Sequence, residues 1–451
     1  MVKQLGVLNC RVMNTTGRRI SIPVQTGDED YDNVSRMATV AISNRGAKRI
    51  RKGHLWVYRS DVRESPDAEA GAIVTVLDEA GNSVGQAFYS DSSEITLRFL
   101  TTGRETIDRD WWRRRLRGCA ARRAAIAHET NAYRLVYSEG DLLPSLIVDV
   151  YDGHYVLQAL SQGSDRLQVE LVELLVEEFQ PRSIMERNDA RVRQLEGLEI
   201  RKGIVYDSVS EPRALATGSS GSNGHHDPLA TAPGSDTPAE IEINQHGVRF
   251  IVSPLGGQKT GAFLDQRENY LAAKEVAKGR ALDCFTFNGG FALHLAGNCE
   301  QVLGIDSAGE AIAGAERNAR LNGISNVTFQ VANVFDALRE MGSAGERFDT
   351  IVLDPPAFTK SRATVKSGAR GYKEINLRAL KLLNPGGVLI TCSCSYHMSE
   401  EMFLEIIAEA ALDAHRHVQI IEKRGQSSDH PVLLGVPETH YLKCVIARVI
   451  E

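Results

Sequence analysis

Acidic, asparagine and cysteine side chains follow apolar runs in the C-terminal half of the chain. Five runs of buried-strand type, RALDCF, QVLGID, NVTFQVA, FDTIVLD and GGVLITC, alternate there with helical stretches such as SAGEAIAGAERNARLN. This alternation predicts a parallel sheet with helices on both faces, and ligands of such sheets bind at the carboxyl ends of the strands. Asp283, Asp306, Asn333, Asp354 and Cys394 stand at or just after these ends, so we expect them to meet at one edge.

The first two strand ends have the features of a site for a ribose-containing ligand. Gly289 and Gly290 permit a tight strand-to-helix turn close to a ligand, although the pattern is not GxGxxG. Asp306 ends the second strand at the distance where an acid accepts hydrogen bonds from ribose hydroxyls. A charge at a helix N-terminus also explains an acid in this place, and Ser307 with Glu310 predicts a capping box for the helix that follows.

The sharpest local signal follows the fourth run, where the sequence reads Asp354-Pro355-Pro356-Ala357-Phe358. Two prolines hold the chain extended, so the Asp354 carboxylate and the backbone carbonyls present a fixed polar rim to a flat substrate. Phe358 is available to stack on that substrate. A structural turn also uses Asp-Pro-Pro, but the glycine turn and the acid of the second strand favour a binding site.

Several motifs in one order resemble class I S-adenosylmethionine-dependent methyltransferases, and more closely the large-subunit ribosomal RNA cytosine-5 methyltransferase I family. They are GGQKTGAFLDQR from Gly256, NGGF from Asn288, DPPAF from Asp354, RGYKEIN from Arg370 and SCS from Ser393. The resemblance covers most of residues 37–451, including the GHLWVY segment and the DLLP segment from Asp141. It implies S-adenosyl-L-methionine as cofactor and methylation of C5 of a cytosine in large-subunit ribosomal RNA.

The resemblance also implies the fold class and the domain organisation. The chain is expected to be α/β, with a small β-barrel-like PUA domain, a central α/β domain and a C-terminal Rossmann-like methyltransferase domain. The five runs and two terminal β runs, HVQIIEKR and YLKCVIARVI, predict a mostly parallel seven-stranded sheet that ends in an antiparallel hairpin. The expected boundaries are a flexible extension at 1–36, the PUA domain at 37–107, the central domain at 108–213, a flexible insertion at 214–240 and the methyltransferase domain at 241–451.

The resemblance implies roles for individual residues. Cofactor contacts are expected from Phe263, Asp283, Phe285, Thr286, Asn288, Gly289, Asp306, Asn333 and Asp354. RNA contacts are expected from Trp56, Lys259, Arg267, Phe358, Arg370, Tyr372 and Lys373. Asn333 replaces the acid that is common after the third strand, but its side-chain oxygen still accepts a hydrogen bond from the adenine amino group. Arg370 and Lys373 either hold phosphate or lower a thiol pKa, or they belong to a solvated helix face.

Methylation at C5 of cytosine requires a cysteine, because a thiolate must add at C6 to make C5 nucleophilic. The resemblance to cytosine-5 RNA methyltransferases implies that the nucleophile is the seventh residue after a Gly-Gly pair at the start of the fifth strand. Counted from Gly387, this residue is Cys394. Cys392 is expected to be a small buried hydrophobe. Asp354 is the candidate for bonding the cytosine amino edge, with the base flipped out of its stack. The base that removes the C5 proton is not identified.

Basic residues are concentrated in the N-terminal half, although the net charge of the chain is -6. Residues 36–134 contain 18 Lys and Arg against 12 Asp and Glu. Their first part predicts a small all-β module, in which Trp56 or Tyr58 contacts RNA bases or Trp56 belongs to the core. Residues 108–130 predict a helix with seven arginines, which either contact phosphates or form a solvated face.

Length and composition restrict the class of protein. A chain of 451 residues predicts two or three domains, and 42% hydrophobic with 24% charged residues exclude a wholly disordered or fibrous protein. The seven cysteines are scattered without a CxxC pair, so we expect reduced thiols and no metal site. No membrane-length apolar stretch or signal peptide is present, so we expect a cytoplasmic protein without a membrane partner. The resemblance implies ribosomal RNA as the partner, and a homodimer is left open. The alternatives are a guanine N-methyltransferase of ribosomal RNA and a non-catalytic RNA-binding ribosome assembly factor.

Overall fold

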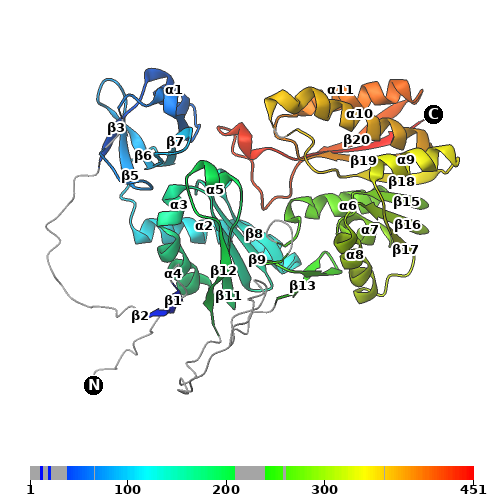
Figure 1. Cartoon of the computed structure of the whole chain (residues 1–451), viewed down its shortest axis with the longest axis horizontal. Helices are drawn as coiled ribbons and strands as arrows, with labels where there is room; N and C mark the ends of the chain where they lie inside the picture. Colours follow the sequence, from blue (N-terminus) through cyan, green and yellow to red (C-terminus); the bar gives the residue numbers. More distant parts are fainter. Residues whose placement is uncertain are drawn as a thin grey trace, which may run out of the picture. The chain divides into compact units, whose positions relative to one another are not determined.

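The structure, a computed structural model, describes residues 38–64, 67–208, 239–256, 261–359 and 361–450, with the backbone of strands β1 (Arg11–Met13) and β2 (Arg19–Ser21). The expected insertion lies almost entirely outside these residues, as does the expected extension apart from the antiparallel β1–β2 pair. The chain divides into two compact units (Figure 1). The first holds the described residues up to Ile241, those between 252 and 262, and Leu433–Val436; the second holds the rest.

The first unit begins with a five-stranded sheet of short strands. In sheet order they are β3 (Thr39–Ala41), β5 (Ile73–Leu77), β6 (Ser83–Tyr89), β7 (Ile95–Thr101) and β4 (Trp56–Tyr58), and the 3-10 helix η1 (Arg59–Asp61) follows β4. Helix α1 (Asn44–Arg51) is an addition to the predicted all-β module. It begins after Ser43, whose hydroxyl accepts a hydrogen bond from the Gly46 amide at 3.1 Å. The β-rich character predicted for this module is confirmed.

A second five-stranded sheet completes the first unit. In sheet order its strands are β12 (Arg201–Asp207), β11 (Ser183–Asn188), β10 (His154–Ala159), β9 (Leu146–Tyr151) and β8 (Ala132–Tyr137). The helices are α2 (Arg109–Glu129), α3 (Gln162–Arg166), α4 (Gln168–Phe179), α5 (Val192–Leu195) and the 3-10 helix η2 (Ser138–Asp141). Trp111, Trp112 and Leu116 of α2 share a core with Leu171 and Leu175 of α4. The helix predicted at 108–130 is therefore confirmed.

Most of the α2 arginines pair with groups of the same unit. Three of them bind glutamates of α4 at N–O distances from 2.5 to 3.1 Å: Arg109 with Glu173 and Glu177, Arg113 with Glu177 and Glu178, and Arg117 with Glu178. Arg122 and Arg123 bind Asp141 at 2.8 and 2.6 Å. The guanidinium of Arg115 lies 4.7 Å from the ring centre of Trp111. This helix face is therefore an ion-paired contact with α4, which neither sequence interpretation anticipated.

The second unit is built on a seven-stranded sheet. In sheet order the strands are β17 (Val327–Val331), β16 (Gln301–Asp306), β15 (Arg280–Cys284), β18 (Phe348–Leu353), β19 (Leu383–Ser393), β21 (Lys443–Val449) and β20 (Val418–Arg424). The first five are parallel, whereas β21 is antiparallel to both of its neighbours. The two terminal runs thus pair as an antiparallel hairpin, as predicted. A two-stranded sheet of β13 (Ile241–Gln245) and β14 (Val248–Val252) precedes this sheet in the chain.

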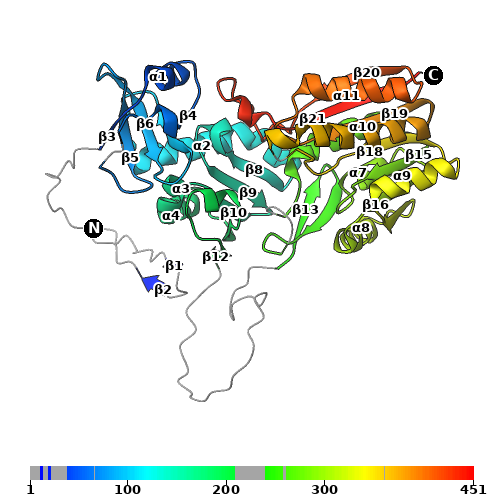
Figure 2. The same cartoon turned by 45° about the horizontal axis from the view of Figure 1, so that its top comes forward.

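Helices cover both faces of this sheet (Figures 1 and 2). One face shares a core with α9 (Val334–Ser343), α10 (Val365–Leu382) and α11 (Glu400–Asp413). The helices α6 (Arg267–Val276), α7 (Gly290–Leu295) and α8 (Gly309–Leu321) lie on the other face. Short 3-10 helices η3 (Leu264–Gln266), η4 (Arg362–Thr364) and η5 (Pro437–Thr439) occur in the connections. Among the described residues, no helix is long and apolar enough to span a membrane.

The predicted capping box at the start of α8 is wrong. The N-cap is Ala308, and no side chain caps the helix. Instead, Oδ1 of Asp306 accepts a hydrogen bond from the Ala308 amide at 3.0 Å. Asp306 therefore bonds the N-cap residue itself, and the acceptor expected from Ser307 for the first turn of α8 is not supplied by a side chain.

Candidate functional site

The turn after β15 is held in an unusual backbone conformation. Phe285, Phe287 and Gly289 have φ angles of 64°, 51° and 90°, in the left-handed region that residues with a Cβ rarely adopt. The Phe287 amide donates a hydrogen bond to Oδ2 of Asp306 at 3.0 Å, and the Asn318 side chain bonds the carbonyl of Asn288 at 3.1 Å. Backbone strain of this kind is characteristic of ligand sites, where the surrounding structure maintains it.

Asp283 lies beneath this turn and is only 1% exposed. Its Oδ2 accepts hydrogen bonds from the Thr286 hydroxyl at 2.6 Å and from the Ala292 amide at 2.9 Å. Its Oδ1 is buried without a hydrogen-bond partner among the described residues. Burial raises the pKa of Asp283 to about 7, with the charge of Asp306 acting in the same direction, against the smaller opposing effect of the two hydrogen bonds. Asp283 therefore keeps an unused acceptor at the first strand end.

The predicted cofactor residues at the neighbouring strand ends differ in their availability. Asp306 binds two backbone amides, but each carboxylate oxygen can accept a second hydrogen bond. Oδ1 of Asn333 caps α9 by accepting bonds from the Phe335 amide at 2.9 Å and the Asp336 amide at 3.4 Å. This oxygen thus serves the helix, while Asn333 remains exposed, and the adenine contact expected from it stays a prediction.

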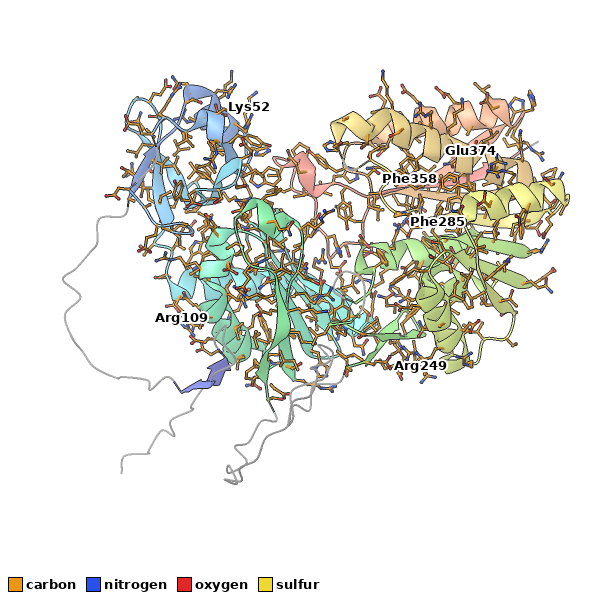
Figure 3. The ribbon with its side chains drawn as sticks, in the orientation of Figure 1. Lys52, Arg109, Arg249, Phe285, Phe358 and Glu374 are labelled. Carbon is orange, nitrogen blue, oxygen red and sulfur yellow. The ribbon has the colours of Figure 1, made fainter. Side chains whose placement is uncertain are left out.

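Aromatic rings surround the end of β18. The ring of Phe358 lies 4.8 Å from that of Tyr372 and 6.4 Å from that of Phe285, centre to centre, and the labelled Phe285 and Phe358 lie near each other in Figure 3. Phe263 contacts Phe287 edge to face, with ring centres 4.9 Å apart. The predicted residues of the β15 turn and of the Asp-Pro-Pro segment are thus brought together in one region.

Asp354 and Cys394 lie on adjacent strand ends. Oδ1 of Asp354 accepts a hydrogen bond from Nε2 of Gln266 at 2.9 Å. The Sγ atom of Cys394 lies 3.8 Å from the carbonyl oxygen of Pro355, so the thiol is beside the Asp-Pro-Pro segment. Cys394 is partly exposed, whereas the five other cysteines in the described part of the chain are buried. Burial raises the pKa of Cys392 far above its ordinary value, which confirms the expected buried hydrophobe.

The predicted RNA-contacting residues of this unit have different environments. Arg267 is 1% exposed and its Nη1 binds Asp429 at 2.9 Å, and Tyr372 is 0% exposed. Both side chains belong to the core, and the RNA contacts expected from them stay predictions. Lys373 binds Glu409 and Asp413 of α11 at 3.1 and 3.0 Å, so its ammonium group serves a helix contact instead of the thiol. Arg370 is exposed, and Lys259 lies outside the described residues.

Two residues near the site were not predicted from the sequence. Gln266 binds Asp354, and Lys443 is buried at the start of β21, where its Nζ donates to the carbonyl of Ser395, the residue after Cys394, at 2.7 Å. The sequence contained a signal for Lys443, since a lysine inside the apolar run YLKCVIARVI needs a buried partner. Gln266 lies in the GGQKTGAFLDQR motif, but the sequence analysis predicts no role for it.

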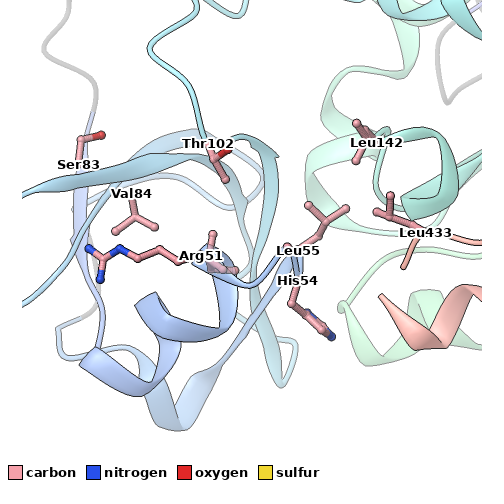
Figure 4. A pocket seen from close by; sticks show the side chains of 10 residues that line it. Arg51, His54, Leu55, Ser83, Val84, Thr102, Leu142 and Leu433 are labelled. Atoms are coloured by element: carbon pink, nitrogen blue, oxygen red, sulfur yellow. The ribbon is translucent and has the colours of Figure 1, made fainter. Parts of the chain in front are cut away.

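The first unit contains a pocket with a volume of about 510 Å³. Its lining includes Arg51, His54 and Leu55 together with Leu142 and Leu433 (Figure 4). Trp56 is half-buried, and its indole Nε1 donates to Oε1 of Glu139 at 3.0 Å. Trp56 is thus only partly buried, and its indole nitrogen is engaged in a hydrogen bond within this unit.

Comparisons with known proteins agree with this architecture. A family model of a PUA-like domain matches residues 40–102, and a model described as S-adenosylmethionine-dependent methyltransferase matches residues 222–436. The chain is 38% identical over 410 residues to ribosomal RNA large subunit methyltransferase I of Klebsiella pneumoniae (strain 342), covering 89% of this chain and 96% of that protein. It is 37% identical over 421 residues to the protein of the same name from Tolumonas auensis, covering 91% and 99%.

A solved structure from Streptococcus mutans, assigned as an S-adenosylmethionine-dependent methyltransferase, matches with a TM-score of 0.74 at 18% identity. It covers 92% of this chain and all of the other. This likeness shows a shared fold. The predicted α/β methyltransferase fold with an N-terminal PUA-like domain is therefore confirmed. From the extent of its identity to these relatives, the chain belongs to the ribosomal RNA large subunit methyltransferase I family and uses S-adenosylmethionine as its cofactor.

Proposed function

We propose that this protein methylates C5 of a cytosine in large-subunit ribosomal RNA through a covalent adduct with Cys394. One observation carries the proposal: Cys394 is the partly exposed thiol among the described cysteines, and it lies beside the Asp-Pro-Pro segment at the edge where the cofactor-type strand ends meet. A nucleophile must be accessible to its substrate, and Cys392 is completely buried. The names of the relatives support ribosomal RNA as the substrate.

The residues at the carboxyl edge fit S-adenosylmethionine. We assign the ribose hydroxyls to Asp306, and we assign the positively charged amino group of the cofactor to Asp283, whose buried Oδ1 lacks a partner among the described residues. Asn288 and Gly289 form the turn between them, and Phe263 and Phe285 supply apolar contacts. When bound, S-adenosylmethionine supplies an electrophilic methyl group.

The chain's own residues account for most of the steps at the base. The thiolate of Cys394 adds to C6 of cytosine, which moves an electron pair toward C5 and makes C5 the nucleophile for the methyl group. After transfer, a base that we do not assign removes the C5 proton, and the C6–sulfur bond breaks to release Cys394. Asp354 bonds the amino edge of the flipped cytosine, and Phe358, supported by Tyr372, stacks on the ring.

The remaining regions bind RNA in this proposal. The PUA domain at 37–107, with Trp56, and the exposed Arg370 contact the phosphates or bases around the target. The other proposed domains are the central domain at 108–213 and the methyltransferase domain at 241–451. The groups assigned to the reaction, Cys394, Asp354 and Phe358, all come from one chain, so the assigned steps do not require a homodimer.

Alanine substitution of the two cysteines tests the proposal. Methyl transfer to ribosomal RNA from a strain lacking the enzyme is followed by nucleoside mass spectrometry, and cofactor binding by calorimetry. We expect Cys394→Ala to lose detectable 5-methylcytosine formation while its affinity for S-adenosylmethionine stays within about three-fold, a change below about 1 kcal/mol. The matched variant Cys392→Ala should remain active.

The other outcomes identify the alternatives. A methylated guanine as product, or an active Cys394→Ala variant, would refute the cytosine-5 mechanism and favour guanine N-methylation. A wild-type protein that binds cofactor and RNA without transferring a methyl group would favour a non-catalytic assembly factor.

A further inference from the structure

Lys443 is a buried cation in the hydrophobic strand β21. It is 3% exposed and pairs across the sheet with Ser393, the last residue of β19. Its Nζ donates to the carbonyl oxygens of Ser395 at 2.7 Å and Tyr441 at 2.8 Å. Burying an ammonium group is costly unless it is compensated, and two neutral carbonyls satisfy only two of its three donors. The position of Lys443 therefore needs a further explanation.

The same contacts attach Lys443 to the turn that carries Cys394. Ser395 follows Cys394 directly, and its side-chain oxygen bonds the Tyr372 hydroxyl at 2.9 Å and accepts from the Thr359 amide at 3.1 Å. These bonds hold the turn between α10 and the segment after Asp-Pro-Pro. The ammonium group is thus bonded to the carbonyl of the residue that directly follows the thiol.

Among the charges around this turn, Lys443 is the cation bonded to the residue that follows Cys394. Burial lowers the pKa of Lys443 to about 8, and negative charge on Cys394 and Glu400 acts in the opposite direction. Glu400 of α11 is bound by Lys423 of β20 at 2.5 Å. Tyr372 of α10 faces Cys394 as a neutral phenol, because burial raises the pKa of its hydroxyl. At neutral pH the ammonium form of Lys443 is therefore the major one.

We propose that the Lys443 ammonium group stabilises the thiolate of Cys394 and so acts as a positioning residue for the nucleophile. This inference rests on the proposed function, since Cys394 must be a thiolate only if it attacks C6. The thiol proton leaves to solvent, and Lys443 keeps its own protons. An ammonium ion fixed beside a thiol favours the ionised sulfur by direct charge attraction.

The rate of Cys394 alkylation tests this pairing without RNA or cofactor. The full-length protein is treated with iodoacetamide between about pH 6 and pH 10, and the Cys394 peptide is quantified by mass spectrometry. At about pH 7 we expect wild-type Cys394 to react at least about ten-fold faster than in Lys443→Met, with Lys443→Arg within about three-fold of wild type. Near pH 10 the rates should converge within about two-fold, because every accessible thiol is then ionised.

Lys423→Met is the matched control, since it removes a lysine bound to Glu400 that does not contact the Cys394 turn. It should alkylate like the wild type. Superimposable curves for wild type and Lys443→Met, or a Lys443→Arg variant as slow as Lys443→Met, would overturn the proposal. If Lys443→Met fails to fold by circular dichroism, the wild-type curve decides: a midpoint below about pH 8.5 supports the pairing, and one at or above about pH 8.5 refutes it.

The two proposals fail in different assays. An active Cys394→Ala enzyme would refute the adduct while the alkylation curves still report whether Lys443 acts on the thiol. Coincident curves with an inactive Cys394→Ala would refute only the role of Lys443.

Discussion

Asp141 and Asp283 are both buried aspartates, but their surroundings are opposite. Asp141 is 3% exposed and accepts hydrogen bonds from Arg122 at 2.8 Å, from two nitrogens of Arg123 at 2.6 Å, and from the Tyr137 amide at 2.7 Å. Asp283 is 1% exposed, binds one hydroxyl and one amide, and leaves an oxygen without a partner among the described residues. The first carboxylate is neutralised by its own chain, and the second is not.

The same contrast holds for the regions around the two residues. The arginines of α2 pair mainly with glutamates of α4 and with Asp141, so a sequence that looks like an RNA-binding face is used to join structural elements. At the carboxyl edge of the catalytic sheet, acceptors have spare capacity and the turn is strained. Between these two aspartates, the acceptor without a partner marks the one at the candidate site, whereas the paired cations mark the one that joins structural elements.

Removing Asp141 should give the largest effect on stability. Asp141→Ala leaves the guanidinium of Arg123, whose side chain is 2% exposed, buried without its counter-ion. Breaking a buried pair in this way costs about 3–5 kcal/mol, which urea denaturation would detect as a large fall in the free energy of unfolding. Arg122→Ala removes the partner with a 52% exposed side chain and should cost less than about 1 kcal/mol. A loss below about 1 kcal/mol for Asp141→Ala would mean that the pairing contributes little to folding.

Asp283 should instead make stability depend on pH. Its folded pKa of about 7 lies above the ordinary value of 3.8, so the folded protein holds the proton more tightly than the unfolded chain does. The stabilisation is complete below about pH 4 and is lost as the pH rises through about 7. Relative to Asp283→Asn, the cofactor-free wild type should lose about 2–3 kcal/mol between about pH 5 and pH 8 in urea denaturation. Parallel pH curves for the two proteins would show that Asp283 is ionised throughout.

Removing Asp306 should weaken cofactor binding with a smaller effect on folding. Asp306→Ala removes the acceptor proposed for the ribose and also the bond to the Phe287 amide that supports the turn. The loss of a hydrogen bond to a charged group costs about 1.5–3 kcal/mol, or roughly ten- to hundred-fold in affinity for S-adenosylmethionine by calorimetry. Asp336→Ala is the matched control, because Asp336 is an exposed aspartate of α9 that pairs with Arg339 at 3.2 Å. Equal affinities for the two variants would place the ribose elsewhere.

The sequence predicted the carboxyl edge of the seven-stranded sheet because apolar runs and helical stretches alternate along the chain. This alternation is a local pattern that can be recognised without knowing the tertiary contacts. It therefore located Asp283, Asp306, Asp354 and Cys394 at the strand ends. It could not predict that Arg267 is buried, because its partner Asp429 lies 162 residues further along the chain. The ion pairs of α2 depend in the same way on glutamates more than 60 residues away. The sequence shows which charged residues need partners if they are buried, but the identity of a partner distant in the chain follows only from the tertiary structure.

The smallest effect is expected for Arg117, and it tests whether α2 binds RNA at all. The Arg117 side chain is 65% exposed and its Nε binds Glu178 at 2.5 Å, so Arg117→Ala should lower stability by at most about 1 kcal/mol. We also expect its affinity for ribosomal RNA, and the slope of that affinity against salt concentration, to remain unchanged in filter binding. A phosphate contact by Arg117 would instead reduce the salt slope by roughly 0.7–0.9 on its loss.

Arg114 is the matched control on the same helix, because it is exposed and no carboxylate of the described residues pairs with it. If Arg114→Ala reduces the salt slope and Arg117→Ala does not, RNA contacts on α2 are restricted to arginines that the fold leaves unpaired. A reduced slope for Arg117→Ala would mean that RNA displaces Glu178 from Arg117. The ion pairs of α2 would then be exchangeable, and the distinction between paired structural charges and available site charges would fail for this helix.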